Sequence, residues 1–226
     1  MIAMRSHGLT MLMLTLCLLS VIAPGIPAQS KPAVGEPPFS RGMKWTYRDR
    51  RPDPSGEIRS GTISITYGGA TTYRGGRYVF MDASYSLRPG TAERLYLDWA
   101  GTHFRQVANV VTNAQRSVLE VVFDRPFRIR VNENTSGTVQ ILENGTPKAS
   151  VPWTYTSTAQ GTTKVTVPAG TFRASRWDAI LKIADREMRT KYFTVGHTDI
   201  RWETTAFASG GQTGMTSVEL VSGPVK

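Results

Sequence analysis

The chain has 226 residues, of which 40% are hydrophobic, and it carries 27 Lys and Arg against 17 Asp and Glu, a formal net charge of +10 at neutral pH. This length is enough for one domain that buries its own core. The only cysteine, Cys17, lies in an N-terminal apolar run that we expect to be removed, which excludes disulfides and cysteine chemistry from the mature protein.

The first residues follow the order that the export machinery recognises: a positive charge, an apolar run and an exit of small residues. Arg5 supplies the charge, residues 9–23 form the run, and Pro24 breaks it before Ala28. A retained membrane anchor is the alternative, but the run is shorter than the roughly 20 apolar residues that a spanning helix needs. We therefore expect residues 1–28 to be a signal peptide, with export to the periplasm or out of the cell, and no later transmembrane segment.

The next residues, 29–41, are rich in Pro and small side chains without any periodicity, which is typical of a flexible tether. We expect a single β domain over residues 42–222 and a short C-terminal tail over residues 223–226.

From residue 42 onward, apolar and polar residues alternate with a period of two, as in strands with one buried face. The alternating sets are Ile63, Ile65 and Tyr67; Leu95, Leu97 and Trp99; Val151, Trp153 and Tyr155; Trp177, Ala179, Leu181 and Ile183; and Ile200 and Trp202. Turn sequences separate them, and Asn144-Gly145 is the most typical of a hairpin.

No helical crossovers lie between these predicted strands, so a parallel α/β sheet is not expected. The pattern indicates a mainly β fold, a single curved antiparallel sheet forming a half-open barrel or a sandwich, with at most one or two short helices. Residues 104–111 fit either a short helix or a strand.

A basic row is expected in the segment where Arg125, Arg128 and Arg130 are interleaved with Phe127 and Ile129. Such a surface attracts polyanions. Because the protein is expected to be exported, anionic lipid head groups, lipopolysaccharide or acidic glycans suit it better than nucleic acid. A solvated strand face is the alternative explanation.

The five tryptophans are Trp45, Trp99, Trp153, Trp177 and Trp202, and all lie in or near alternating segments. Such rings usually pack in a core. If the sheet stays open, some of them would instead line a concave face that binds a lipid or another apolar ligand. The candidate ligand-binding residues are therefore Trp153, Trp177, Trp202, Arg125, Arg128 and Arg130.

Catalytic motifs are scarce in the sequence. After signal removal only His103 and His197 remain as imidazoles, so we expect no metal or other cofactor. The His-Glu-x-x-His, Gly-x-Ser-x-Gly and Gly-x-x-x-x-Gly-Lys patterns are absent from the sequence. His197 and Asp199 could form a base and its orienting carboxylate, but no nucleophile is indicated. We expect a non-enzymatic protein, with a hydrolase using His197 as the alternative.

The segment Val165–Phe172 reads VTVPAGTF. It resembles the VxVPAGTF strand-turn-strand signature of exported bacterial proteins of the DUF3108-like group, whose function is unknown. Gly42–Tyr47 is similar to the GxxWxY first strand of that group, and Lys191–Gly196 with Ile200–Glu203 is similar to its later strands. The resemblance implies a curved antiparallel sheet like the half-barrels of periplasmic lipoprotein carriers, and it implies no catalytic residues.

The same segment also has a physical interpretation. Pro168 removes a ladder donor and ends a strand, Ala169-Gly170 reverse the chain, and Phe172 returns into the core. Taken together, the sequence predicts an exported protein that binds an apolar or amphiphilic ligand in a curved β-sheet. The alternative is a scaffold module that docks an anionic envelope partner through its basic strand faces.

Overall fold

The computed structural model describes residues 37–53, 55–101, 103–129 and 132–225, so the predicted signal peptide, most of the predicted tether and Arg130 lie outside the described residues. Within these residues the chain forms twelve strands and no helix: β1 (Lys44–Pro52), β2 (Ile58–Tyr73), β3 (Gly76–Tyr85), β4 (Ala92–Trp99), β5 (Phe104–Thr112), β6 (Val118–Arg128), β7 (Glu133–Glu143), β8 (Thr146–Val167), β9 (Gly170–Ile183), β10 (Arg186–Val195), β11 (Thr198–Ala208) and β12 (Gly211–Ser222). The predicted mainly β class is confirmed, and residues 104–111 belong to a strand.

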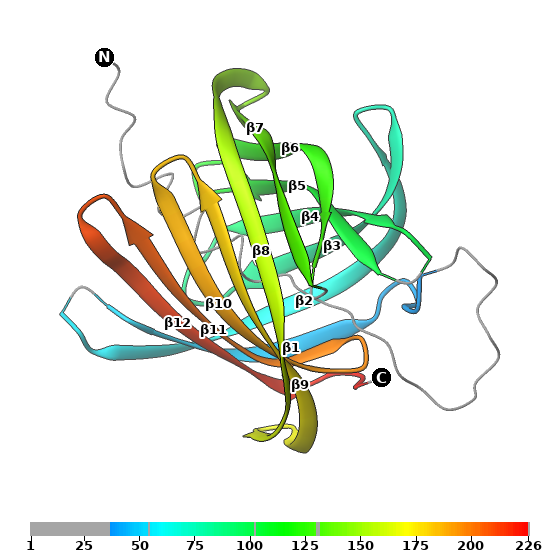
Figure 1. The fold of residues 1–226 in the computed structure, drawn as a ribbon, viewed down its shortest axis with the longest axis vertical. Helices are drawn as coiled ribbons and strands as arrows, with labels where there is room; N and C mark the ends of the chain where they lie inside the picture. The colour runs from blue at the N-terminus through cyan, green and yellow to red at the C-terminus, as the bar shows by residue number, and fades with distance from the viewer. Residues whose placement is uncertain (1–36, 54, 102, 130–131, 226) are drawn as a thin grey trace.

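The strands form one antiparallel sheet in which each strand pairs with its neighbours in the chain. β1 pairs along its whole length with β2 and through Thr46–Arg50 with β12, which closes the sheet into a barrel (Figure 1). The expected half-open barrel is thus refined to a closed one. A local pattern cannot reveal this closure because the strands that meet are the first and the last.

The up-and-down order gives the barrel two distinct ends. The end that we call the terminal end holds the start of β1, the finish of β12 and the turns at residues 73–76, 99–104, 167–170 and 195–198. The opposite end, called the distal end, holds the turns at residues 52–58, 85–92, 112–118, 143–146, 183–186 and 208–211. Both chain segments that flank the barrel therefore reach its terminal end.

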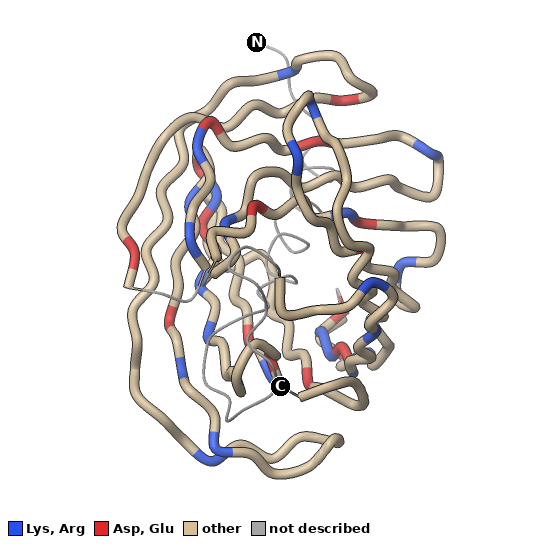
Figure 2. Tube along the Cα trace, turned by 90° about the vertical axis from the view of Figure 1, so that its right-hand side faces the viewer, with Lys and Arg blue, Asp and Glu red and all other residues tan. Residues whose placement is uncertain are grey.

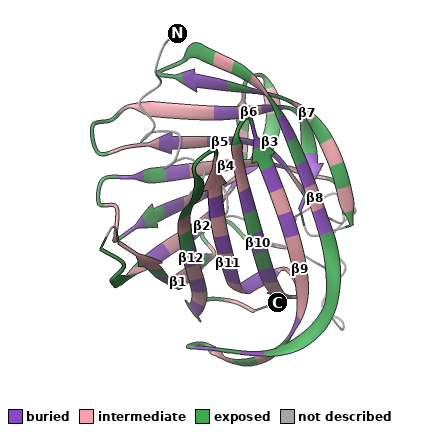
Figure 3. Cartoon of the chain, turned by 60° about the vertical axis from the view of Figure 1, so that its left-hand side comes forward, coloured by how far each residue is buried: buried purple, intermediate pink, exposed green. Residues whose placement is uncertain are grey.

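The interior is filled by the inward rows of the alternating strands. Buried and accessible residues alternate along β9, β10 and β11 (Figure 3). The predicted rows on β2 and β4 behave as expected, since Ile63, Ile65 and Leu95 are fully buried. Large rings fill the width of the barrel, and the bulkiest fully buried side chains include Trp45, Trp153 and Trp202. Burial of such aromatic surface is the main stabilising contribution.

The VTVPAGTF segment forms a strand-turn-strand corner at the terminal end. β8 ends at Val167, Pro168 and Ala169 form the turn, and β9 begins at Gly170. Val167 is buried and Phe172 packs half-buried against the core. The Ala169 N–H donates to the Leu220 carbonyl oxygen at 3.1 Å, which ties this corner to β12.

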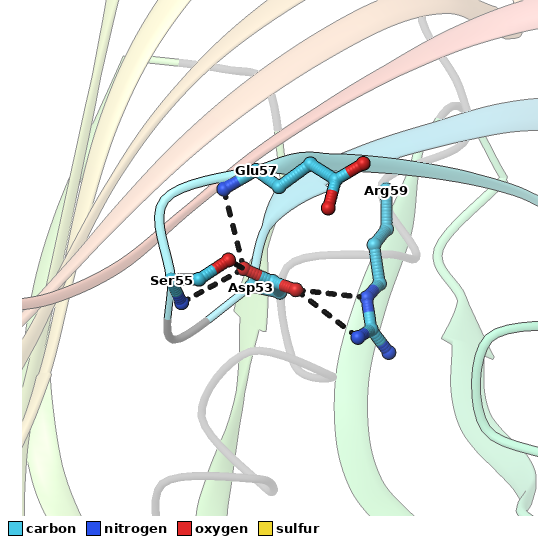
Figure 4. A network of polar contacts seen from close by, with 4 residues as sticks. All are labelled: Asp53, Ser55, Glu57 and Arg59. Atoms are coloured by element: carbon cyan, nitrogen blue, oxygen red, sulfur yellow. Dashed lines mark hydrogen bonds and ion pairs between the residues drawn. The ribbon is translucent and has the colours of Figure 1, made fainter.

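The distal turn between β1 and β2 is organised by one carboxylate (Figure 4). Asp53 Oδ1 accepts hydrogen bonds from the Ser55 N–H at 2.8 Å and the Glu57 N–H at 3.2 Å, while Oδ2 accepts from Arg59 Nε at 3.1 Å. The hydrogen bond from the Ser55 hydroxyl is the main cause that lowers the pKa of Asp53. In a tight turn, backbone N–H groups lack partners in the sheet, and the Asp53 carboxylate accepts their hydrogen bonds instead.

Phe39, within the predicted tether, packs into the terminal end. Its ring lies edge-on against Trp45 at 5.0 Å and Tyr67 at 5.6 Å between centroids, and it stacks on Phe104 at 6.1 Å. The C-terminal segment reaches the same place, since the Pro224 carbonyl accepts hydrogen bonds from Trp45 Nε1 and Thr198 Oγ1, both at 3.0 Å. These segments together seal much of the terminal end.

A core substitution should separate barrel packing from surface effects. Trp202 is 1% exposed and meets Tyr47 edge-on at 4.8 Å, so Trp202→Ala should lower the free energy of unfolding by about 3–5 kcal/mol. Val221, on β12 and 39% exposed, is the control. Val221→Ala should change the free energy of unfolding by less than about 0.5 kcal/mol. Urea unfolding followed by circular dichroism measures both, and equal effects would contradict the packing described for β11.

Candidate functional site

A hollow of about 550 Å³ lies at the terminal end and is called the terminal hollow. Its lining comprises Pro37, Phe39, Arg41, Tyr67, Gly69, Ala70, Arg77, Tyr78, Val79, Asp98 and Trp99. These residues come from the N-terminal segment and from β2, β3 and β4. The hollow therefore begins where the barrel interior meets solvent, and its volume lies within the range typical of small-molecule sites.

The inner part of the terminal hollow is aromatic. Tyr67 and Phe39 are buried, and the Trp99 ring lies 4.6 Å from the Phe104 ring between centroids. Burial raises the pKa of Tyr67 to about 12, so this phenol stays neutral at physiological pH. Trp99 Nε1 is buried and has no hydrogen-bond partner among the described residues. This atom has almost no accessible surface, so it lies within the aromatic wall and not on the face that meets the hollow.

Two exposed arginines, Arg41 and Arg77, lie at the rim. Arg77 continues the inward row of Val79 and Met81 on β3, so the closing curve of the sheet brings its guanidinium group to the mouth of the barrel. Neither arginine has an ion-pair partner within the part of the chain that the structure describes. The one carboxylate of the lining, Asp98, is already paired with Arg105. The rim is therefore electropositive.

The sequence predicted other residues for the site, and the structure places them in separate regions. Trp202 packs against Tyr47, and Trp153 packs against Phe123 and Phe127 at 5.1 Å between centroids. Trp177 is half-buried on the inward row of β9. None of the three lines the terminal hollow. Their predicted role in ligand binding stays a prediction.

The predicted arginines lie beside a bulge in β6. Pairing of β6 with β7 stops at Phe123, and Asp124 leaves the ladder to accept a hydrogen bond from Trp153 Nε1 at 3.1 Å. Arg128 Nε donates to Glu133 at 2.6 Å, and Arg125 lies 3.8 Å from Asp124. Both predicted arginines that the structure describes thus have a carboxylate nearby.

Charge is interspersed over the barrel in the same way. Figure 2 shows acidic positions among the basic ones along the strands in view. Arg48 pairs with Glu219 at 2.5 Å and Arg176 with Asp178 at 2.8 Å, for example. Most described strand arginines have such partners, and Arg50, Arg116 and Arg173 are among the described arginines that do not. Arg41 and Arg77 differ from these because they line the terminal hollow. The alternation of Arg77 with Val79 and Met81 could have revealed an arginine at the end of an inward row.

His197 lies in the β10–β11 turn at the terminal end. Its ring faces that of Phe39 edge-on at 6.4 Å between centroids, and the neighbouring Thr198 hydroxyl donates to Pro224. These contacts give the turn a structural role in sealing the barrel. Among the described residues no cluster of three or more His, Cys, Asp or Glu is arranged to hold a metal ion, and no helix is long and apolar enough to cross a membrane.

Sequence reasoning missed a buried carboxyl group near the distal end. Glu93, on β4, is 2% exposed and accepts hydrogen bonds from the Tyr85 hydroxyl and from Asn109 Nδ2, the latter at 2.6 Å. The Arg88 guanidinium covers the Tyr85 ring at 3.8 Å. Burial raises the pKa of Glu93 to about 7, although its hydrogen bonds and Arg88 oppose the shift.

Two solved structures are similar to this chain. One is a candidate lipoprotein from Parabacteroides distasonis ATCC 8503, with 12% identity and a TM-score of 0.46 over 81% of this chain and 95% of that chain. The other is a candidate exported protein with a YmcC-like fold from Bacteroides fragilis NCTC 9343, with 11% identity and a TM-score of 0.49 over 81% and 96%. No protein-family model matches the chain, and no curated protein matches it significantly. The resemblance to the DUF3108-like group stays a prediction.

Glu93 should make the stability of the barrel depend on pH. The folded state raises its pKa from 4.5 to about 7, so the stabilisation is complete below pH 4.5 and is lost as the pH rises to about 7. Between pH 4.5 and pH 7, the free energy of unfolding of the wild type should therefore fall by up to about 3 kcal/mol relative to that of Glu93→Gln. Urea unfolding at pH 5 and pH 8 measures this difference.

Glu143→Gln is the matched control for this measurement, because Glu143 is exposed and forms a surface ion pair with Lys148 at 3.4 Å. The difference between Glu143→Gln and the wild type should stay the same at both pH values. If the Glu93→Gln difference is equally constant, the carboxyl group does not titrate in this range.

Proposed function

We propose that the protein is an exported binding protein that holds an anionic amphiphile in the terminal hollow. The observation that carries this proposal is the pairing of an aromatic wall with a rim of two arginines that have no carboxylate partner among the residues the structure describes. The apolar part of the ligand would lie against Tyr67 and Trp99, and its anionic group between Arg41 and Arg77. Export rests on the sequence of residues 1–28.

The chemistry of the hollow supports an amphiphile over a purely apolar ligand. A hydrocarbon would bring apolar atoms against the guanidinium groups of Arg41 and Arg77. A small anion without an apolar chain would leave the aromatic wall in contact with water. A ligand with one anionic group and one short apolar segment satisfies both surfaces.

The hollow also limits the size of the ligand. Phe39 lines the hollow and packs on Trp45, Tyr67 and Phe104, so the space in front of it takes a head group and part of a chain. A two-chain lipid exceeds a volume of about 550 Å³. We therefore favour a single-chain phosphate, sulfate or carboxylate.

Isothermal titration with dodecyl phosphate and with dodecylphosphocholine, below their micelle concentrations, tests the proposal on residues 29–226. The two probes share a chain, and only the first has a net negative charge. Dodecyl phosphate should bind more tightly, and added salt should weaken it. Arg41→Gln and Arg77→Gln should each weaken its binding about tenfold, which corresponds to one charge-assisted hydrogen bond.

Arg125→Gln is the matched control, since it removes the same charge from a side chain that is 63% exposed and does not line the hollow. It should leave dodecyl phosphate binding unchanged. Equal binding of the two probes, or a loss only with Arg125→Gln, would contradict this site. The latter result would support the alternative, in which an anionic envelope partner docks on the basic strand face.

A further inference from the structure

A second hollow, of about 390 Å³, lies on the outer face of β2, β3, β4 and β5 and is called the outer hollow. Its polar lining consists mainly of hydroxyl groups and one ion pair: Ser64, Thr66, Ser84 and Thr112 with Asp82 and Arg94. Glu93 also borders the hollow, but it is 2% exposed and its carboxylate is hydrogen-bonded to Tyr85 and Asn109. These side chains lie on the opposite face of the strands from Ile63, Ile65 and Met81, which fill the barrel interior. The outer hollow is therefore separate from the terminal hollow.

The ion pair of the outer hollow is held rigidly. Arg94 Nε and one terminal nitrogen donate to the two oxygens of Asp82 at 2.7 and 2.9 Å. The guanidinium group also lies over the Phe80 ring at 4.2 Å. Phe80 in turn occupies the space where a Cβ of residue 68 would lie, and Gly68 leaves that space open. This stack fixes the plane of the guanidinium and carboxylate groups before any ligand arrives.

An aromatic ring stands beside this pair. Tyr96 lines the outer hollow and stacks on Tyr73, with 3.9 Å between ring centroids and 16° between the planes. The Tyr73 hydroxyl donates to Glu120 at 2.9 Å, which holds the supporting ring in place. The Tyr96 ring is thus immobilised at the border of a hydroxyl-lined depression.

We propose that the outer hollow binds a neutral sugar. The bidentate pair uses two of the five N–H donors of Arg94, and Arg94 also hydrogen-bonds to Tyr96. Its remaining donors lie beside free lone pairs of Asp82, so donors and acceptors stay side by side in one fixed plane. Each sugar hydroxyl both donates and accepts, and the C–H face of a sugar ring can pack on Tyr96. The two charges cancel, which favours a neutral polyol over the anionic ligand of the terminal hollow.

Side chains of the pair remain accessible to such a ligand. The exposed fraction is 42% for the Arg94 side chain and 45% for that of Asp82. The depression also lies within the range of volumes that small-molecule sites have. A sugar would therefore reach the polar plane without displacing any residue of the core.

NMR titration of residues 29–226 with N,N′-diacetylchitobiose and with maltose tests this inference. At least one of the two neutral disaccharides should shift the amide signals of β2 to β5 around Asp82 and Tyr96. Tyr96→Ala and Arg94→Lys should each weaken that binding about tenfold or more, the first by removing the apolar ring and the second by removing the bidentate plane.

Glu203→Gln is the control variant, because Glu203 forms a similar pair with Arg201 on another part of the barrel. It should leave sugar binding unchanged, and dodecyl phosphate should leave the amides around Asp82 unshifted. No shift with either disaccharide, or shifts that survive both Tyr96→Ala and Arg94→Lys, would overturn the inference. Neither result depends on binding at the terminal hollow, which is measured separately.

Discussion

Closure of the sheet through β1 is the constraint on which the rest of this structure depends. Once β1 pairs with both β2 and β12, every strand has two neighbours, and the interior meets solvent only at the two ends. The terminal end cannot be sealed by strands, so Phe39 and the Pro224 carbonyl complete it from outside the sheet. The terminal hollow lies where that seal is incomplete, beside rings that belong to the interior.

A barrel of twelve strands is wide. Its inward-facing side chains must therefore either fill the interior or, where they are polar, form hydrogen bonds with one another. Aromatic clusters such as Phe123, Phe127 and Trp153 do the first. The Thr190 and Thr204 hydroxyls, 3.1 Å apart, do the second, and so does the Glu93 group with its phenol and amide partners. Polar side chains inside the barrel therefore fix local packing and make stability sensitive to protonation.

The sequence predicted the features that depend on neighbours along the chain. Period two placed Ile63, Leu95 and Trp202 on the buried face, and Pro168 marked the corner between β8 and β9. It could not predict features that depend on contacts between distant segments. The pairing of Thr46 with Ser222 has no local signature, and neither does the packing of Phe39 into the barrel mouth. The sequence left open whether the tryptophans pack in a core or line the concave face of an open sheet. Closure of the sheet places Trp153 and Trp202 in packed clusters.

Most arginines of this protein are neutralised by a neighbouring carboxylate, so the net charge of +10 says little about where anions bind. A row of arginines attracts an anion only to the extent that neighbouring carboxylates leave it uncompensated. Arg128 has Glu133 and Arg94 has Asp82, so each presents a polar plane of nearly zero charge. Arg77 has no such partner in the described part of the chain, because it ends an inward row formed with apolar residues such as Val79 and Met81. One fold can thus offer an electropositive hollow at its mouth and a neutral one on its wall, and the difference follows from which arginines face a carboxylate across the sheet.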